Sequence, residues 1–191
     1  MKIGLYFGSF NPVHIGHMAI ANYILEFSEI DKLWFVVSPQ NPHKKKSSLL
    51  AENHRYELLN LAITDVAKYK VCTVEFNMPK PSYTIDTLTY LNEKYPDNNF
   101  YLIMGADNLA SFEKWKNYDI ILKNHKLLVY PRPEYNDLPL LSHKNVILVD
   151  APLIEISSSF IRKSIKEKTD VSAFMPCKVA EYIKEMHFYE K

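Results

Sequence analysis

The sequence contains little glycine, little cysteine and almost no net charge. Its 191 residues include 4 glycines and 2 cysteines, and 23 Lys and Arg residues are almost balanced by 22 Asp and Glu residues. Without an excess of positive charge, the chain is not expected to bind long nucleic acids. Cys72 and Cys177 are far apart and lack the spacing of metal ligands, so we expect two reduced, packed thiols in a reducing compartment.

Long apolar runs are also missing from the sequence. No run is long enough to span a membrane, and the N-terminus leads directly into a short strand-like segment rather than a signal peptide. We therefore expect a cytoplasmic protein without a membrane partner. The length suits one domain over residues 1–191, and the sequence leaves the oligomeric state open, a homo-oligomer included.

Short apolar runs alternate with helical patterns along the chain. The expected strands are 3–7, 33–37, 71–76, 100–104 and 126–130, with a candidate sixth at 146–149. The expected helices are 15–27, 58–66, one capped by Ser82 or Thr84, 109–115, 157–168 and 176–186. This alternation predicts an α/β fold with a doubly wound parallel sheet, strand order 3-2-1-4-5, and C-terminal helices.

The most informative segment is 8–17, which reads Gly-Ser-Phe-Asn-Pro-Val-His-Ile-Gly-His between the first strand and the first helix. His14 and His17 are three residues apart, on one face at the start of the helix. A helix N-terminus suits phosphate, and two imidazoles add hydrogen-bond donors. Gly8 and Gly16 permit close backbone approach. A solvated histidine pair is the alternative, but the complete motif after a strand favours a phosphate site.

Two further segments point to the same crevice. Residues 156–162 read Ile-Ser-Ser-Ser-Phe-Ile-Arg, in which Arg162 follows a serine-rich helix start. Alone, this segment fits an ordinary serine cap and a surface arginine, but with the histidine motif it favours a polyphosphate clamp. Gly105-Ala106-Asp107 follows the fourth strand. Ligands bind where the strand order reverses, between strands one and four, so this segment should face the histidine turn.

These motifs closely resemble those of the bacterial nicotinate mononucleotide adenylyltransferases, within the HxGH nucleotidyltransferase superfamily. The resemblance covers nearly the full chain and includes 42–44, 54–55, 81–84 and Trp115. It implies a Rossmann-like nucleotidyltransferase fold. It also implies transfer of the adenylyl group of ATP to nicotinate mononucleotide in NAD biosynthesis, which yields deamido-NAD and pyrophosphate, with Mg²⁺ bound to the ATP phosphates and no protein metal site.

The resemblance also assigns roles to residues. It implies three catalytic residues that bind and polarise the ATP phosphates, His14, His17 and Arg162. The implied ATP-binding residues are Gly8, Ser9, Phe10, His14, His17, Gly105, Asp107, Ser157, Ser159 and Arg162. The implied mononucleotide-binding residues are His43, Lys44, Ser82, Tyr83, Thr84 and Trp115. Core packing is an equally good interpretation of Trp115, although an indole face can also stack on a cationic nicotinate ring.

The sequence departs from the family pattern at three places. Ser159 stands where Thr is commoner, but it keeps a hydroxyl. Phe7 stands where many members have a second glycine. The segment 131–134, Pro-Arg-Pro-Glu, lacks the glycine that often follows there, which puts any role of Arg132 in doubt. Arg55 is expected to do no more than pair with a nearby acid such as Glu52.

The resemblance suggests a mechanism that needs no general base. The second pKa of a phosphate monoester is near 6, so the attacking phosphate is already ionised at neutral pH. Catalysis would then rest on positioning and on stabilising negative charge.

Several other functions remain open. The acceptor could be phosphopantetheine or nicotinamide mononucleotide, and a cytidylyltransferase would use the same histidine motif. A class I synthetase fragment is disfavoured because no tRNA-binding extension is present. A catalytically silent nucleotide-binding regulator is a further alternative. The resemblance favours the acid over the amide, which is nearly isosteric with it.

Overall fold

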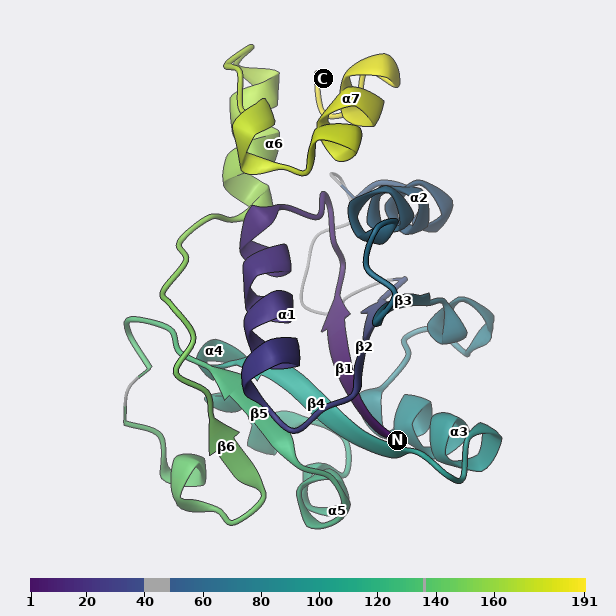
Figure 1. Ribbon diagram of the computed structural model, residues 1–191, viewed down its shortest axis with the longest axis vertical. Helices are drawn as coiled ribbons and strands as arrows, with labels where there is room; N and C mark the ends of the chain where they lie inside the picture. Colours follow the sequence, from purple (N-terminus) through teal and green to yellow (C-terminus); the bar gives the residue numbers. More distant parts are fainter. Residues whose placement is uncertain (40–48, 136) are drawn as a thin grey trace.

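The computed structural model describes residues 1–39, 49–135 and 137–191, and its centre is a six-stranded parallel sheet (Figure 1). The order is β3-β2-β1-β4-β5-β6, so the predicted order is confirmed and the candidate sixth strand exists. The strands are β1 (Lys2–Gly8), β2 (Lys32–Val37), β3 (Tyr69–Cys72), β4 (Asn99–Gly105), β5 (Leu127–Tyr130) and β6 (Val146–Leu148).

Helices cover both faces of the sheet, as the doubly wound prediction requires. One face carries α1 (Ile15–Phe27) and α2 (Glu52–Ile63). The helices α6 (Ser158–Lys166) and α7 (Cys177–Glu185) lie beyond the carboxyl end of β1 and join the same apolar core (Figure 1). The other face carries α3 (Thr84–Lys94), α4 (Ala106–Leu109) and α5 (Tyr118–Asn124). The central strands are buried on both faces, which explains why the segments around Leu5 and Phe35 read as continuous apolar runs.

The prediction of one strand over 71–76 is wrong in its second half. Pairing with β2 ends at Cys72, and the chain continues as a 3₁₀ helix, η2 (Val74–Asn77). Glu75 lies in η2 with its carboxylate turned inward, where it accepts hydrogen bonds from the hydroxyls of Ser82 (2.9 Å) and Thr87 (2.8 Å). The apolar residues around Glu75 favour a strand in the sequence. In the structure, the hydrogen bonds to Ser82 and Thr87 stabilise this segment as a 3₁₀ helix.

Two helix predictions are also corrected. The N-cap position of α3 is occupied by Tyr83, not by Ser82 or Thr84, and no side chain caps the helix. The Ser82 hydroxyl donates to Glu75 instead. The connection from β4 to β5 was expected to hold one helical stretch at 109–115. It contains α4, the 3₁₀ helix η3 (Phe112–Lys114) and also α5, which the sequence did not indicate.

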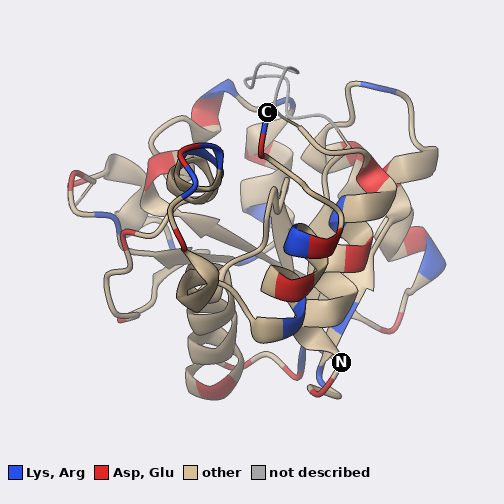
Figure 2. Ribbon diagram, turned by 90° about the horizontal axis from the view of Figure 1, so that it is seen from above, with Lys and Arg blue, Asp and Glu red and all other residues tan. Residues whose placement is uncertain are grey.

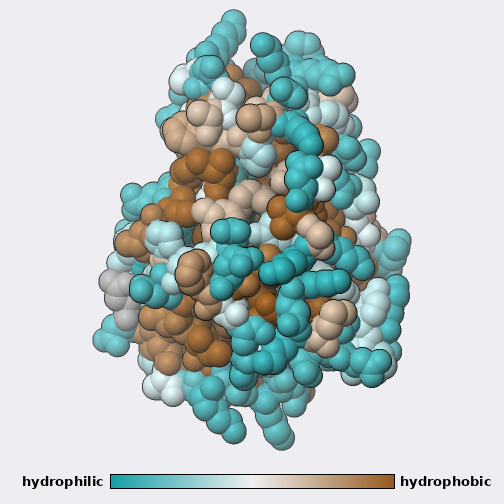
Figure 3. Space-filling view, viewed as in Figure 1, coloured by the Kyte–Doolittle hydropathy of each residue, from teal (hydrophilic) through white to brown (hydrophobic). Residues whose placement is uncertain are grey.

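The surface mixes both signs of charge and several apolar areas. Seen from above, Lys and Arg alternate with Asp and Glu rather than forming one field (Figure 2). In the view of Figure 1, brown apolar areas are separated by hydrophilic side chains (Figure 3). Within the described ranges, none of the helices combines the length and the apolar character needed to cross a lipid bilayer.

Candidate active site

The segment 8–14, here called the histidine turn, begins where β1 ends. Phe10 has a positive φ of 45°, and its ring is buried between Tyr6 and Phe35 with centroid distances of 5.7 and 5.6 Å. A Cβ at Gly8 would lie 2.8 Å from the Phe10 ring, so Gly8 makes room for that ring. The aromatic side chain therefore anchors the turn in the core.

Four carbonyl oxygens of the histidine turn accept hydrogen bonds from the segments around it. The pairs are Gly8 with Ser38 N (3.0 Å), Ser9 with Arg55 Nη1 (2.9 Å), Asn11 with Arg162 Nη1 (2.8 Å) and Pro12 with Ser158 Oγ (2.9 Å). The C=O and N–H of a trans peptide point in opposite directions. The amides of Ser9, Phe10 and Val13 therefore point away from this scaffold, an arrangement that suits an anion.

The two histidine rings lie together at the start of α1. His14 precedes the helix and His17 is its third residue, with ring centroids 3.7 Å apart. His17 Nδ1 accepts from the backbone N–H of His14 (3.3 Å), so a neutral His17 ring carries its proton on Nε2. A Cβ at Gly16 would lie 3.0 Å from the His14 ring, which explains the glycine between the histidines.

Burial decides the charge of His14. Desolvation, followed by the positive charge of Arg132, lowers the pKa of His14 to about 4, so the ring is neutral near pH 7. Its Nδ1 is buried without a hydrogen-bond partner in the part of the chain that the structure describes. A neutral imidazole has one N–H, so His14 can act at this site as a hydrogen-bond donor but not as a cation.

The serine-rich start of α6 docks on the histidine turn from the far end of the sequence. The Ser157 hydroxyl caps α6 by accepting from Phe160 N (3.1 Å), as predicted. Arg162 donates to the turn and also to Ser159 Oγ (3.2 Å). Ser158, which was not singled out from the sequence, donates to Pro12. The predicted juxtaposition of the two motifs is therefore present, but Ser157 and Ser159 already have protein partners.

Asp107 and Arg132 meet across the ends of β4 and β5. A Cβ at Gly105 would displace the Asp107 carboxylate and lie 3.0 Å from the Tyr130 ring, so glycine leaves room for both side chains. Arg132 Nε lies 3.5 Å from Asp107 Oδ1, and the guanidinium lies 5.1 Å from the centroid of Tyr130. The positive charge of Arg132 also lowers the pKa of His14, so Arg132 acts on the histidine turn electrostatically. The departure of segment 131–134 from the family pattern therefore does not remove Arg132 from this region.

Arg55 is the main residue that sequence reasoning undervalued. It was expected to pair with an acid, but its guanidinium is 1% exposed and donates to four backbone carbonyls. These are Leu50 (3.0 Å), Ser9 (2.9 Å), Ser38 (2.7 Å) and Pro39 (3.1 Å). Desolvation lowers the pKa of Arg55, and the negative charge of Glu52 opposes this shift. Arg55 thus fixes the histidine turn and the end of β2 together.

The residues expected at the mononucleotide lie on α3 and on the segment after η3. Tyr83 is 42% exposed, and Lys116 Nζ lies 4.9 Å from its ring centroid and 2.9 Å from Asp86. These contacts bring the Trp115 segment to the start of α3, beside Thr84. Trp115 is half-buried and packs on Phe112 with a centroid distance of 5.2 Å. His43 and Lys44 lie outside the described residues.

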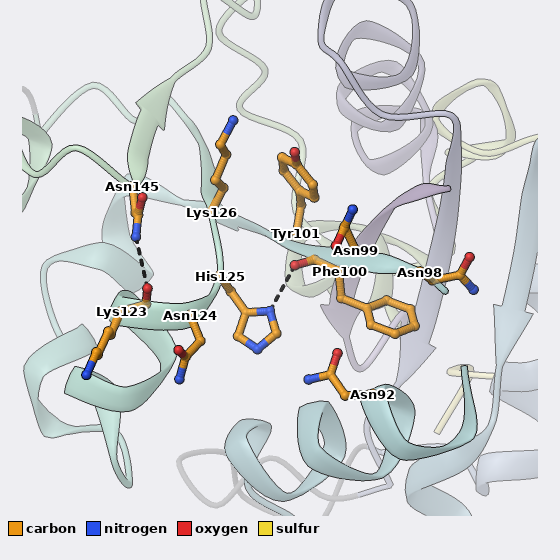
Figure 4. Close-up of a pocket in the computed structure, with 10 residues that line it drawn as sticks. All are labelled: Asn92, Asn98, Asn99, Phe100, Tyr101, Lys123, Asn124, His125, Lys126 and Asn145. Atoms are coloured by element: carbon orange, nitrogen blue, oxygen red, sulfur yellow. Dashed lines mark hydrogen bonds between the residues drawn. The ribbon is translucent and has the colours of Figure 1, made fainter. Parts of the chain in front are cut away.

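A separate cavity of about 390 Å³ lies at the opposite end of the sheet, before β4 and β5 begin (Figure 4). Its lining is rich in asparagine, but His125 Nδ1 is hydrogen-bonded to the Phe100 carbonyl (2.9 Å) and Asn145 donates to the carbonyl of Leu122 (2.9 Å). These polar groups stabilise the local backbone. The cavity is therefore distinct from the histidine turn, none of whose residues lines it.

The parallel sheet, with a histidine turn at the point where its strand order reverses, is the arrangement of a nucleotidyltransferase. In agreement, the family model described as cytidylyltransferase-like matches residues 5–164. The structure also resembles a Plasmodium falciparum nicotinic acid mononucleotide adenylyltransferase solved with NaAD. The TM-score is 0.82 and the sequence identity 21%, with 99% of this chain and 97% of the other covered.

Closer relatives identify the family within this class. The chain is 51% identical to the "probable nicotinate-nucleotide adenylyltransferase" of Flavobacterium johnsoniae, and the match covers 100% of both chains. It is 48% identical to the protein of the same name from Cytophaga hutchinsonii, over 99% of this chain and 98% of that one. The chain belongs to the nicotinate-nucleotide adenylyltransferase family, as the sequence motifs indicated.

Proposed function

We propose that this protein transfers the adenylyl group of ATP to nicotinate mononucleotide, forming deamido-NAD and releasing pyrophosphate. The observation that carries this proposal is the histidine turn, whose carbonyls are bound by the surrounding segments, so that the amides of the same peptide groups point away from those donors. The His14 and His17 rings lie together at the end of this turn, and Arg162 binds its Asn11 carbonyl. Membership of the family supplies the substrates, because its curated relatives bear the name of this reaction.

In the reaction, the ionised phosphate of the mononucleotide attacks the α-phosphorus of ATP in line. The bond from the α-phosphorus to the bridging oxygen breaks, and pyrophosphate leaves with the electron pair. The N–H groups of the turn, the His17 Nε2–H and the Arg162 guanidinium are proposed to stabilise the charge on the triphosphate. A neutral His14 suits this role because it donates a hydrogen bond without competing for a proton.

Mg²⁺ is proposed to arrive with ATP. Among the described residues, no group of three or more His, Cys, Asp or Glu side chains is placed to hold a metal, and Asp107 already faces Arg132. Mg²⁺ commonly takes most of its ligands from phosphates and water, so such a site needs no protein cage. When bound, the ion would neutralise charge on the triphosphate.

The acceptor side of the site is proposed to hold the pyridine nucleotide, with Trp115, Thr84 and the backbone around Tyr83 as its boundary. The test is pyrophosphate release from ATP with nicotinate mononucleotide, nicotinamide mononucleotide or phosphopantetheine as acceptor. We expect the acid to give the highest kcat/KM. Preference for another acceptor would contradict the proposed substrate, and ATP binding without release from any acceptor would support a regulator.

A further inference from the structure

The C-terminal segment 186–189 closes back on the histidine turn. The Tyr189 hydroxyl donates to Asn11 Oδ1 at 2.8 Å, across 178 residues of sequence. Figure 1 shows the C-terminus between α6 and α7, at the end of the molecule where β1 leads into α1. None of the motifs read from the sequence includes Tyr189, and the described mechanism does not use it.

Asn11 is the residue at which three distant segments meet. It is 3% exposed, and its side-chain oxygen accepts from Leu50 N (3.2 Å) as well as from Tyr189. Its backbone carbonyl accepts from Arg162 (2.8 Å). A shift of Asn11 would therefore move both the backbone of the histidine turn and the acceptor that holds Arg162.

Contacts of the neighbouring residues place the Tyr189 hydroxyl in this position. The backbone around it has positive φ values at His187 (54°) and Tyr189 (68°), and Phe188 N donates to the Ile183 carbonyl (3.1 Å). The Phe188 ring packs on His54 with a centroid distance of 4.8 Å. The tail is thus fixed on α2 and α7, so that the hydroxyl reaches the turn from a packed base.

The charges of two guanidinium groups, those of Arg162 and Arg55, act on the Tyr189 hydroxyl. Burial raises the pKa of Tyr189 well above its usual range, and the charges of Arg162 and Arg55 oppose that shift. The hydroxyl is therefore protonated, and a donor, throughout the physiological range. Its neighbours are the two arginines that bind the carbonyls of Asn11 and Ser9.

We propose that Tyr189 is a positioning residue for the bound triphosphate, acting through Asn11 on the histidine turn and Arg162. The inference rests on the proposed function. A buried hydrogen bond is worth a modest amount on its own, but small misplacements of groups that contact a reacting phosphate reduce the rate strongly. The effect should therefore fall on ATP and on the reaction, with the mononucleotide site unaffected.

The test compares Tyr189→Phe with Tyr182→Phe. The Tyr182 hydroxyl lies in the same aromatic cluster, 3.3 Å from His54 Nδ1, and among the described residues it makes no hydrogen bond to the turn. We expect Tyr189→Phe to lower kcat/KM for ATP by about five- to tenfold and to weaken binding of a non-hydrolysable ATP analogue, with KM for the mononucleotide unchanged. Tyr182→Phe should stay within about twofold of the natural protein, and both variants should melt at similar temperatures.

A double-mutant cycle tests whether Tyr189 acts through Asn11. If it does, Tyr189→Phe added to Asn11→Ala should cost much less than Tyr189→Phe alone. Equal losses in Tyr189→Phe and Tyr182→Phe, a loss that follows melting temperature, or full additivity would each overturn the inference. No pyrophosphate release by the unmodified protein would count against the proposed function, whereas an active protein insensitive to Tyr189→Phe would count against this inference alone.

Discussion

The two sides of the proposed site, one for the phosphates and one for the acceptor, are built differently. The phosphate side, which comprises the histidine turn with His17, Arg55, Ser158 and Arg162, is held by hydrogen bonds to four of its carbonyls. The acceptor side, which comprises residues 82–84 and 115–118, includes the exposed Tyr83 ring and is joined by the Lys116–Asp86 ion pair at the surface. Exposed ion pairs contribute little to stability. Stability and catalysis should therefore be coupled on the phosphate side and separable on the acceptor side.

The largest expected effect is on stability, from Arg55→Met. Removing the guanidinium leaves four carbonyls without their donor in a site that is 1% exposed. Unsatisfied buried acceptors are costly, so we expect the free energy of unfolding to fall by about 3 kcal/mol. Urea denaturation measures this change.

Two other variants make the Arg55 result interpretable. Arg55→Lys should recover part of the loss, because an ammonium group keeps the charge but has fewer donors. Lys68→Met removes an exposed cation that pairs with Glu26 at 3.5 Å, and it should change stability by no more than about 0.5 kcal/mol. If Arg55→Met were as mild as Lys68→Met, the phosphate side would not be held as described.

The next effect is on turnover, from His17→Ala. Losing one donor to the developing charge should lower kcat by about 10²-fold with the fold intact, as measured by pyrophosphate release and circular dichroism. His143→Ala removes a histidine that accepts from Asn145 N (3.2 Å), away from the crevice, and should leave kcat within about twofold. A folded His17→Ala protein at full activity would refute the proposed role of His17.

A third effect concerns pH. The pKa of His14 is about 4 in the folded protein and 6.5 in the unfolded chain, so between these values the unfolded chain binds more protons. The stabilisation is complete above pH 6.5 and is lost as the pH falls towards 4. Between pH 7 and pH 4.5, His14 should therefore lower the free energy of unfolding by about 2 kcal/mol. Denaturation at both pH values should show a smaller loss for His14→Gln than for the natural protein, and equal losses would contradict burial of a neutral ring.

Sequence reasoning succeeded where the signal was local. The parallel α/β class follows from apolar runs that alternate with helical patterns, and the strand order is the usual one for such a sheet. The Ser157 cap follows from a serine before an amphipathic segment. The partners of Arg55 could not be predicted, because they are carbonyls that any sequence offers and that only the folded chain brings together. The predicted helix cap at Ser82 is wrong for a related reason. Its hydroxyl donates to the Glu75 carboxylate, and only the folded chain brings these two residues together.

The smallest effect is expected from Trp115→Ala. This variant tests most directly whether the phosphate side and the acceptor side act independently. If the indole stacks on the pyridine ring, its loss should raise KM for nicotinate mononucleotide by about tenfold, with KM for ATP unchanged. Trp115→Phe keeps an aromatic face and should recover most of this loss. The packing of Trp115 on Phe112 means that stability must be measured in parallel. If KM rises for both substrates together, Trp115 affects both binding sites. The structural difference between the two sides would then not correspond to a difference in function.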